Sequence, residues 1–438
     1  MRILSILSAA ALCASTFGTA ATAGPLPQPI SDADFPTFDE EMVLLGRDLF
    51  FDPVLSGNKN IACATCHHPS LGTSDGMSLS IGEGGTGLGT KRRIVLDNKP
   101  KERIPRNAPA LFNLGAREFS VMFHDGRVAV DRTAMYGIRM PEGRTLERPV
   151  MSPLAAQNIL PVLSPNEMSG HPGENPVADA VAAERIHGPT GAWGILSARV
   201  DAIPTYNRRF AKLGVSEVHI TDIANALSSF ITTEFRATDS PFDRFLNGQN
   251  AMSEDALAGM DLFYGKARCS TCHAGAFQTD HDFYAIGLPQ LGPGKNAHAA
   301  YADTGRGKVT GNPEDAYRFR TPTLRNVTQT APYGHNGAYV DLEDMVRHHL
   351  DALKGLTSYD RSAARLSSDI VANDFEAMED MEEVIRIAEA IEIPDVTLSD
   401  AQVAQIMAFL DALTDDTVVS KGLGAPRRVP SGLPLDPS

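Results

Sequence analysis

Cys63-Ala64-Thr65-Cys66-His67 is one of two Cys-x-x-Cys-His stretches in this chain, and Cys269-Ser270-Thr271-Cys272-His273 is the other. In this pattern the two thiols bond covalently to the vinyl groups of a haem, and the imidazole that follows takes the iron. Zinc ribbons also use two Cys-x-x-Cys pairs, but those lie about 15–20 residues apart. The two stretches therefore predict two covalently bound c-type haems, with His67 and His273 as proximal iron ligands.

The N-terminus has the pattern of a secretory signal peptide. Arg2 supplies a positive charge, residues 3–14 form an apolar run, and Ala21-Thr22-Ala23 is a small-residue cleavage site. Of the five cysteines, only Cys13 lies outside the haem motifs, and it falls in this segment. We expect residues 1–23 to be removed and the mature protein to be periplasmic, without a structural disulfide.

Composition narrows the class of protein further. A length of 438 residues suggests about two to three domains. The net charge of −15 argues against a nucleic-acid partner, which would need a basic stripe, and it suits a basic redox partner or simply solubility. No later stretch approaches the roughly 18 uninterrupted apolar residues of a membrane span. We therefore expect no membrane span. A homodimer is compatible with these features.

The sequence around the two motifs is duplicated. A helix-period apolar pattern precedes each motif, and Ser253 is a good N-cap for the second of these helices. A Pro-x-Leu-x-Asn string and a His-Asp/Asn-Gly turn follow each motif. The paired stretches are Leu45 to Phe51 with Ala258 to Tyr264, Pro109 to Asn113 with Pro322 to Asn326, and His124 to Gly126 with His335 to Gly337.

This duplication predicts a mainly α-helical fold of two tandem cytochrome c-like haem domains with long Gly/Pro-rich loops. The chain has 37 Gly and 29 Pro and little alternating strand pattern. We place the first domain at residues 24–237, the second at 238–425, and a flexible tail at 426–438.

A third group of residues carries a more specific signal. Gln157, Pro161 and Glu167 stand in the string Gln-x-x-x-Pro-Val-x-x-x-x-Glu-Met. With this string and the stretch from Phe319 to Tyr333, the chain resembles the bacterial di-haem cytochrome c peroxidase and MauG superfamily, from about Phe38 to about Leu413. The resemblance implies that the first domain holds a peroxidatic haem and the second an electron-transfer haem.

The resemblance also implies that the third group forms the peroxide pocket. Cleavage of peroxide requires a proton to leave one oxygen and reach the other, and a nearby carboxylate can carry it. We expect Glu167 to be that acid/base, Gln157 to hold the peroxide through its amide, and Pro161 to pack the pocket wall. Without the spacing that the string shares with the family, we would expect Glu167 to be a solvated loop carboxylate.

The second haem needs a ligand on its other face, and the segment 341–353 is the candidate. Asp341 caps a predicted helix whose apolar positions recur at offsets of three and four. They are Leu342, Met345, Val346, His349, Leu350 and Leu353. His349 is thus expected to face inward and His348 outward, so that substituting His348 should change little.

His349 falls where the resembled peroxidases carry an axial Met and the MauG proteins an axial Tyr. The resemblance therefore implies a bis-histidine second haem, whose reduction potential lies below that of a Met/His haem. Met345, on the same predicted face, is the alternative ligand, and a purely structural His349 is the other alternative.

The first haem departs from the resembled peroxidases at a loop position. Many of them carry a blocking histidine sixteen residues beyond the proximal one, where this chain has Glu83. Five glycines lie between residues 82 and 89, which makes this loop costly to fix in place. A carboxylate is a poor ligand for ferrous haem, so we expect an open or water-bound first haem that needs no reductive activation. A solvated Glu83 side chain is the plain alternative, and it fits the same expectation. His68, His171 or His187 are the alternatives for a blocking group.

Two more expectations rest on the resemblance. His124 stands where the family commonly has Trp between the haems, so it is a candidate for that path and, less favoured, for a haem ligand; the single Trp193 lies in an inserted stretch. Asn107, Thr330 and Pro332 match a calcium site built from one side-chain oxygen and backbone carbonyls.

The sequence thus predicts a periplasmic oxidoreductase of the cytochrome c peroxidase type. It would reduce H2O2 at the first haem with electrons that a small cytochrome c or cupredoxin delivers to the second. A MauG-like oxidase that modifies a partner protein is one alternative. A non-catalytic di-haem electron carrier is the other, and it would leave Gln157 and Glu167 without a role.

Overall fold

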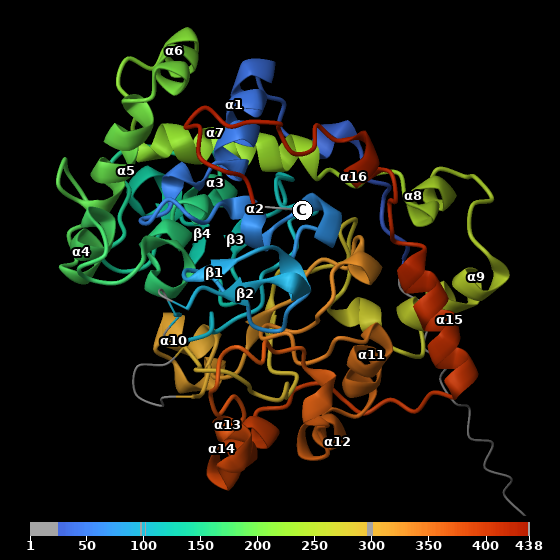
Figure 1. Ribbon diagram of the computed structural model, residues 1–438. Coiled ribbons are helices and arrows are strands. Elements are labelled where there is room, and N and C mark those ends of the chain that lie inside the picture. Colours follow the sequence, from blue (N-terminus) through green and yellow to red (C-terminus); the bar gives the residue numbers. More distant parts are fainter. Residues whose placement is uncertain (1–24, 97–98, 101, 296–300, 437–438) are drawn as a thin grey trace, which may run out of the picture.

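The computed structural model describes residues 25–96, 99–100, 102–295 and 301–436 (Figure 1). The expected signal peptide, including Cys13, lies outside the described residues. The fold is mainly helical, as predicted. In the part of the chain that is described, no helix is both long and apolar enough to cross a membrane.

The helices of the N-terminal half are α1 (Glu40–Phe51), α2 (Cys63–Cys66), α3 (Pro153–Asn158), α4 (Pro176–Ala182), α5 (Ala192–Asp201), α6 (Pro204–Lys212) and α7 (Ile220–Glu234). Those that follow are α8 (Pro241–Leu246), α9 (Glu254–Tyr264), α10 (Arg306–Thr310), α11 (Leu342–Leu350), α12 (Ala352–Thr357), α13 (Glu376–Glu379), α14 (Met381–Glu389), α15 (Asp400–Asp411) and α16 (Val418–Lys421).

Short antiparallel ladders tie the loops together. β1 (Gly85–Thr86) pairs with β2 (Arg93–Ile94), and β6 (Phe283–Tyr284) pairs with β7 (Phe319–Arg320). A three-stranded sheet has the order β3-β4-β5, formed by Val121–Met122, Val128–Val130 and Ile138–Arg139.

Two helix pairs repeat one packing arrangement. α1 packs across α7, and α9 packs across α15 (Figure 1). At each crossing the partner backbone approaches a glycine: a Cβ on Gly46 would lie 1.9 Å from the Ala226 carbonyl oxygen, and one on Gly259 would lie 1.8 Å from that of Gln405. Gly46 and Gly259 hold the same position in the duplicated sequence. The sequence repeat is therefore also a repeat of helix packing.

Asn113 and Asn326 occupy equivalent positions in the two halves and make equivalent hydrogen bonds. The Asn113 backbone N–H donates to the Phe235 carbonyl (2.9 Å), and its side-chain amide exchanges two hydrogen bonds with the backbone two residues further on (3.0 and 2.8 Å). Asn326 makes the same three bonds to Leu413 and to the backbone two residues beyond it (3.1, 3.2 and 3.1 Å). Both asparagines have the left-handed backbone conformation, with φ of 61° and 57°, which Asn tolerates.

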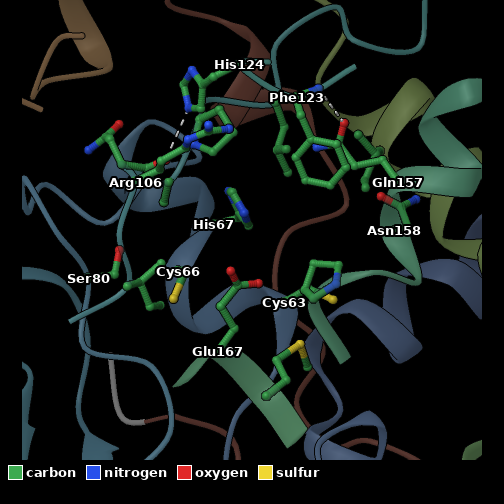
Figure 2. Close-up of a pocket in the computed structure, with 18 of the residues that line it drawn as sticks. Cys63, Cys66, His67, Ser80, Arg106, Phe123, His124, Gln157, Asn158 and Glu167 are labelled. Carbon is green, nitrogen blue, oxygen red and sulfur yellow. Dashed lines mark hydrogen bonds between the residues drawn. The ribbon is translucent and has the colours of Figure 1, made fainter. Parts of the chain in front are cut away.

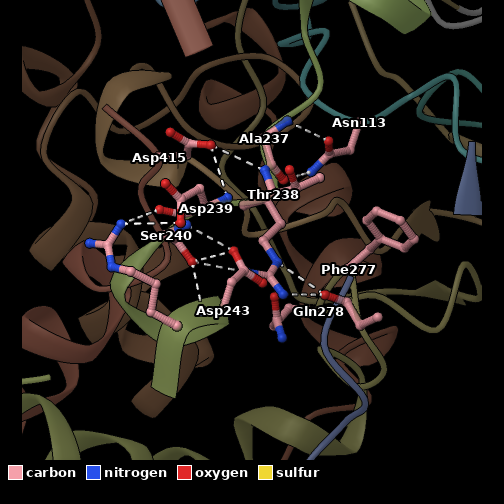
Figure 3. A network of polar contacts seen from close by, with 12 residues as sticks. Asn113, Ala237, Thr238, Asp239, Ser240, Asp243, Phe277, Gln278 and Asp415 are labelled. Carbon is pink, nitrogen blue, oxygen red and sulfur yellow. Dashed lines mark hydrogen bonds and ion pairs between the residues drawn. The ribbon is translucent and has the colours of Figure 1, made fainter. Parts of the chain in front are cut away.

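The segment between the halves is fixed rather than loose. The chain leaves α7 at Glu234 and enters α8 at Pro241, and within this link Ala237 and Ser240 are buried. Asn113 holds the link from one side, and the Asp415 carboxylate accepts from the backbone N–H groups of residues 238 and 239 from the other (3.1 and 3.0 Å) (Figure 3). The predicted boundary near residue 237 thus falls in a pinned segment.

Buried ion pairs join the two halves elsewhere. Arg106 bonds Asp303 (2.6 Å) and also Asp125 (2.6 Å), and these three side chains are nearly inaccessible to solvent. Arg103 pairs with Asp374 (2.7 Å) across the same junction. A buried charge left without its partner is costly, so these pairs fix how the halves meet.

The C-terminal segment differs from the flexible tail that was expected. Ser431 donates to the Asp52 carboxylate (2.6 Å), Val429 is buried in the core of the N-terminal half, and Asp436 accepts a hydrogen bond from Thr65 of α2. The red segment in Figure 1 accordingly ends beside α2. Its Pro and Gly content was typical of a loose tail, but the packing surface it covers comes from residues far away in sequence.

Candidate haem-binding sites

One cavity in the N-terminal half gathers the first haem motif and the predicted pocket residues. It is lined by Cys63, Cys66, His67, Gln157, Pro161 and Glu167, among others. Figure 2 shows His67 and Glu167 pointing into the same space, with Gln157 on a neighbouring wall. The spacing-based prediction therefore brought together residues about a hundred positions apart in the chain.

The wall of this cavity that carries the first haem motif could bind a metal through His67. His67 follows directly after α2, and its Nδ1 lies 3.0 Å from the Thr73 carbonyl oxygen. A carbonyl only accepts, so Nδ1 carries the proton and Nε2 keeps its lone pair. Burial lowers the pKa of His67, which keeps the imidazole neutral. Two thiols and one ligating imidazole on one cavity wall are the donor set of a c-type haem.

The wall that carries Gln157, Pro161 and Glu167 is formed where an α-helix is followed by short 3-10 and π-helical segments. Gln157 lies in α3, Pro161 begins a short 3-10 helix, and Glu167 lies in a π-helical turn over Pro165–Ser169. Gln157 Oε1 accepts from the Phe123 backbone N–H (3.3 Å), which orients the amide nitrogen for donation elsewhere. π turns are rare and recur at functional sites.

The loop that carries Glu83 supports this π turn from behind. The Glu83 N–H donates to the Asn166 carbonyl (3.0 Å), and a Cβ on Gly82 would lie 2.1 Å from the same oxygen. The Arg92 guanidinium donates to three carbonyls of the loop, those of Ile81, Gly82 and Gly87. The glycine-rich loop is thus held tightly by one arginine.

Glu83 itself is buried, so the alternative of a solvated loop side chain was wrong. It is 1% exposed, and Asn60 (2.7 Å) and Asn58 (3.0 Å) donate to its carboxylate. Asparagines more than twenty positions away supply these bonds, so local loop composition could not reveal them. Glu83 is not among the residues that line the cavity.

The alternative blocking histidines also lie away from the cavity. His68 bonds the Ser70 hydroxyl (2.7 Å) beside α2, and His171 bonds the Asn166 side chain (3.2 Å). His187 packs edge-on against Trp193, which is buried in the core. Among the described residues, His67 and His124 are the only histidines that line this cavity.

The second haem motif faces His349 of α11. The His273 and His349 ring centroids are 6.3 Å apart. Two imidazole nitrogens that each lie about 2 Å from one metal are about 4 Å apart, and their ring centroids lie farther out. The separation therefore fits an iron between the rings. Each ring also places Nδ1 near a carbonyl, that of Gln278 (3.2 Å) for His273 and that of Met345 (2.9 Å) for His349.

The prediction for His348 was wrong, because this residue is buried rather than facing solvent. Its Nε2 lies 2.8 Å from the Ile286 carbonyl, its Nδ1 lies 3.1 Å from the Tyr339 hydroxyl, and Gly355 of α12 packs on the ring. α11 ends at Leu350 and α12 folds back over it, which covers a second helix face. Leu353 consequently lies on α12 and is 51% exposed.

His124 lines the first cavity at the junction with the C-terminal half. Its carbonyl accepts from the Arg320 N–H (2.7 Å), and its Nε2 lies 3.4 Å from the Asn107 carbonyl. Burial, followed by the charges of Arg106 and His335, lowers the pKa of His124 to about 3, so the ring is neutral.

The residues expected to bind calcium lie at the same junction. The Asn107 N–H donates to the His335 carbonyl (2.9 Å), while Thr330 and Pro332 lie a few residues before that histidine. Within the described ranges, no group of three or more His, Cys, Asp or Glu side chains forms a metal site. A calcium ion here would depend on amide and backbone oxygens.

Three cations line the first cavity, Arg106, Arg127 and Lys295, and the sequence did not point to any of them as a site residue. Arg127 stacks on the Phe123 ring at 3.5 Å and pairs with Asp125 (2.9 Å). Its position directly after the His-Asp-Gly turn was a usable signal. Lys295 comes from the other half of the chain, so no local pattern could have indicated it.

Comparisons with known proteins agree on one family. The family model described as di-haem cytochrome c peroxidase matches residues 40–251. The methylamine utilization protein MauG of Methylorubrum extorquens is 32% identical over 316 residues, covering 71% of this chain and 69% of that protein. Cytochrome c551 peroxidase of Nitrosomonas europaea is 31% identical over 308 residues, covering 70% of this chain and 72% of the relative.

A solved structure shows the same fold. The di-haem peroxidase BthA of Burkholderia thailandensis superposes with a TM-score of 0.57 over 96% of this chain and 97% of that one, at 18% identity.

Proposed function

This chain belongs to the di-haem cytochrome c peroxidase and MauG family, and we propose that it reduces hydrogen peroxide at the N-terminal cavity. It is an oxidoreductase of the cytochrome c peroxidase type. One H2O2 takes up two electrons and two protons and yields two molecules of water. The observation that carries this proposal is the convergence of Cys63, Cys66 and His67 with Gln157 and Glu167 on one cavity.

Cys63 and Cys66 would hold the first haem through thioether bonds, and His67 would bind its iron. When bound, this haem supplies the redox centre at which peroxide is cleaved. Glu167 would accept a proton from one peroxide oxygen and return it to the departing one, as general acid–base catalysis requires. Gln157 would donate its free amide hydrogens to the peroxide, and Pro161 would exclude competing donors from the wall.

The second site is proposed to serve electron relay. Cys269 and Cys272 would attach a second haem c, and His273 and His349 would bind its iron from opposite sides. Both imidazoles hold their Nδ1 hydrogen on a carbonyl, which raises the basicity of the ligating nitrogen. With both imidazoles bound, this iron would have no free position for peroxide, so the haem would supply electron relay. We infer that the two sites belong to two tandem haem domains, residues 24–237 and 238–425.

The electron donor is proposed to be a small cytochrome c or cupredoxin with a basic face. Cys272 is partly exposed, and burial followed by the negative charges of Asp280, Glu392 and Asp282 raises its pKa, with Glu392 also paired to Arg318. An acidic surface near the relay site favours a basic partner. We also infer a periplasmic location and a calcium ion at Asn107, Thr330 and Pro332, from the export signal and the family resemblance.

The function is tested by donor oxidation. Two molecules of a small ferrocytochrome c should be oxidised for each H2O2 consumed. A Cys269→Ala/Cys272→Ala variant should lose cytochrome-driven turnover, yet its first site should still react with H2O2. Peroxide consumption without cytochrome oxidation in the wild-type protein would refute the peroxidase assignment.

One observation also fits the MauG-like alternative. Apart from His67, the one histidine that lines the cavity among the described residues is His124, whose Nε2 lies 3.4 Å from the Asn107 carbonyl, and His68, His171 and His187 lie away from it. An oxidase that uses peroxide in its resting state would need an open site. Peroxide-dependent modification of a partner protein, with no oxidation of cytochrome, would favour this alternative.

A further inference from the structure

Lys295 is the single residue after position 231 that lines the N-terminal cavity, within the described part of the chain. Every other lining residue comes from the half that carries the first haem motif. The C-terminal half thus adds one cationic side chain to a site that is otherwise complete without it.

The backbone around Lys295 is held closely. Its N–H donates to the Ala302 carbonyl (3.3 Å), and its own carbonyl accepts from the Lys308 ammonium. Gly294 has φ of +67°, and a Cβ there would lie 2.5 Å from the carbonyl carbon of Tyr301. A glycine is therefore required immediately before Lys295 for the chain to make this turn.

Lys295 differs in its ion pairing from the other two cations that line the cavity. Arg106 is neutralised by Asp125 and Asp303, and Arg127 shares Asp125. Among the described residues, Lys295 has no ion pair, and Glu167 is the one carboxylate that lines the cavity.

The side chain stays charged in this setting. Burial, and then the charges of Arg127 and Arg106, lower the pKa of Lys295 to about 8, while Glu167 and Asp125 act in the opposite direction. A pKa of about 8 leaves the ammonium protonated at neutral pH.

We propose that Lys295 is a charge-stabilising residue of the peroxide site, supplied across the domain junction, whose ammonium stabilises negative charge on bound peroxide and on other small anions. This inference rests on the proposed function. A positive charge that already stands at a cavity wall lowers the energy of an anion bound there. Glu167 and Lys295 would then present a proton acceptor and a fixed cation to the same ligand.

Azide binding to the ferric first haem tests the proposal without any turnover. Lys295→Met removes the charge and should weaken azide affinity by about 10–100-fold, as expected for losing one charge a few ångströms away at intermediate dielectric. Lys295→Gln should do the same, and Lys295→Arg should keep most of the affinity. Lys212→Met removes an exposed lysine at the end of α6 and should leave affinity unchanged.

A neutral ligand supplies the second readout. Carbon monoxide bound to the ferrous first haem should show a higher C–O stretching frequency in Lys295→Met, because a nearby positive charge lowers that frequency. A purely structural role of Lys295 would not produce this shift.

Each other outcome overturns the proposal. Unchanged azide affinity and C–O frequency would mean that the ammonium does not face the ligand. Tighter azide binding in Lys295→Met would mean that the lysine blocks the site, and a wild-type protein that binds no azide would mean that the cavity is closed. A failure of cytochrome oxidation alone would instead count against the proposed function, because azide binding does not require it.

Discussion

Glu167→Gln is expected to slow the reaction of the protein with H2O2 by about 10²–10⁴-fold, the usual contribution of a positioned general acid–base group. The substitution keeps the size of the side chain and removes its ability to take up a proton. Glu167 is the one carboxylate that lines the cavity among the described residues, so no neighbour can substitute for it. Stopped-flow mixing with H2O2 measures the effect directly.

The π turn around Glu167 does not depend on the carboxylate that this substitution removes. The turn is held by backbone bonds from residues 167, 168 and 169 to the Ser164 carbonyl, and none uses the Glu167 carboxylate. Glu167→Gln should therefore leave the absorption spectrum and azide binding of the first haem in place. Glu142→Gln, an exposed change in the same half, is the matched control. A Glu167→Gln rate close to that of wild type would exclude the acid–base role.

His349→Ala is expected to convert the second haem from a low-spin bis-imidazole centre to a high-spin centre with an open position. The reduction potential of this haem should rise, because an imidazole ligand is lost. EPR of the ferric protein reads the spin state, and added imidazole should restore the low-spin signal by entering the vacated site. Electron delivery from ferrocytochrome c should fall accordingly.

Two neighbours on α11 supply the controls for His349→Ala. Met345→Ala removes the alternative ligand and should leave the low-spin signal unchanged. His348→Ala should also keep that signal but lower the free energy of unfolding, because the Tyr339 hydroxyl and the Ile286 carbonyl lose a buried partner at about 1–3 kcal/mol each. A low-spin signal that disappears in Met345→Ala and persists in His349→Ala would contradict the assignment.

The parts that sequence could predict are those set by local pattern. The Ser253 cap and the Asp341 cap begin α9 and α11 as expected, with side-chain bonds to Ala256 (3.1 Å) and Glu343 (2.7 Å). Mainly helical structure follows from the apolar periods in the duplicated stretches. Position in the duplicated strings also indicated that Asn113 and Asn326 are equivalent, and their identical clamps bear this out.

The features that the sequence did not predict are contacts between segments that lie far apart in the chain. His348 faces away from the apolar stripe of its own helix, but α12 and the backbone near Ile286 cover that face. Glu83 lies in a glycine-rich loop, yet two distant asparagines bury it. Lys295 enters the first cavity from the second half of the chain. Such contacts arise from tertiary packing, which periodicity along one segment does not encode.

We expect an open first haem and a six-coordinate second haem, and EPR of the fully ferric protein distinguishes this arrangement from two closed haems. The spectrum should show one high-spin and one low-spin bis-imidazole signal, with the high-spin signal lost on the first addition of H2O2 and no prior reduction needed. Two low-spin signals that do not change with H2O2 until one electron is added would show that both haems are closed.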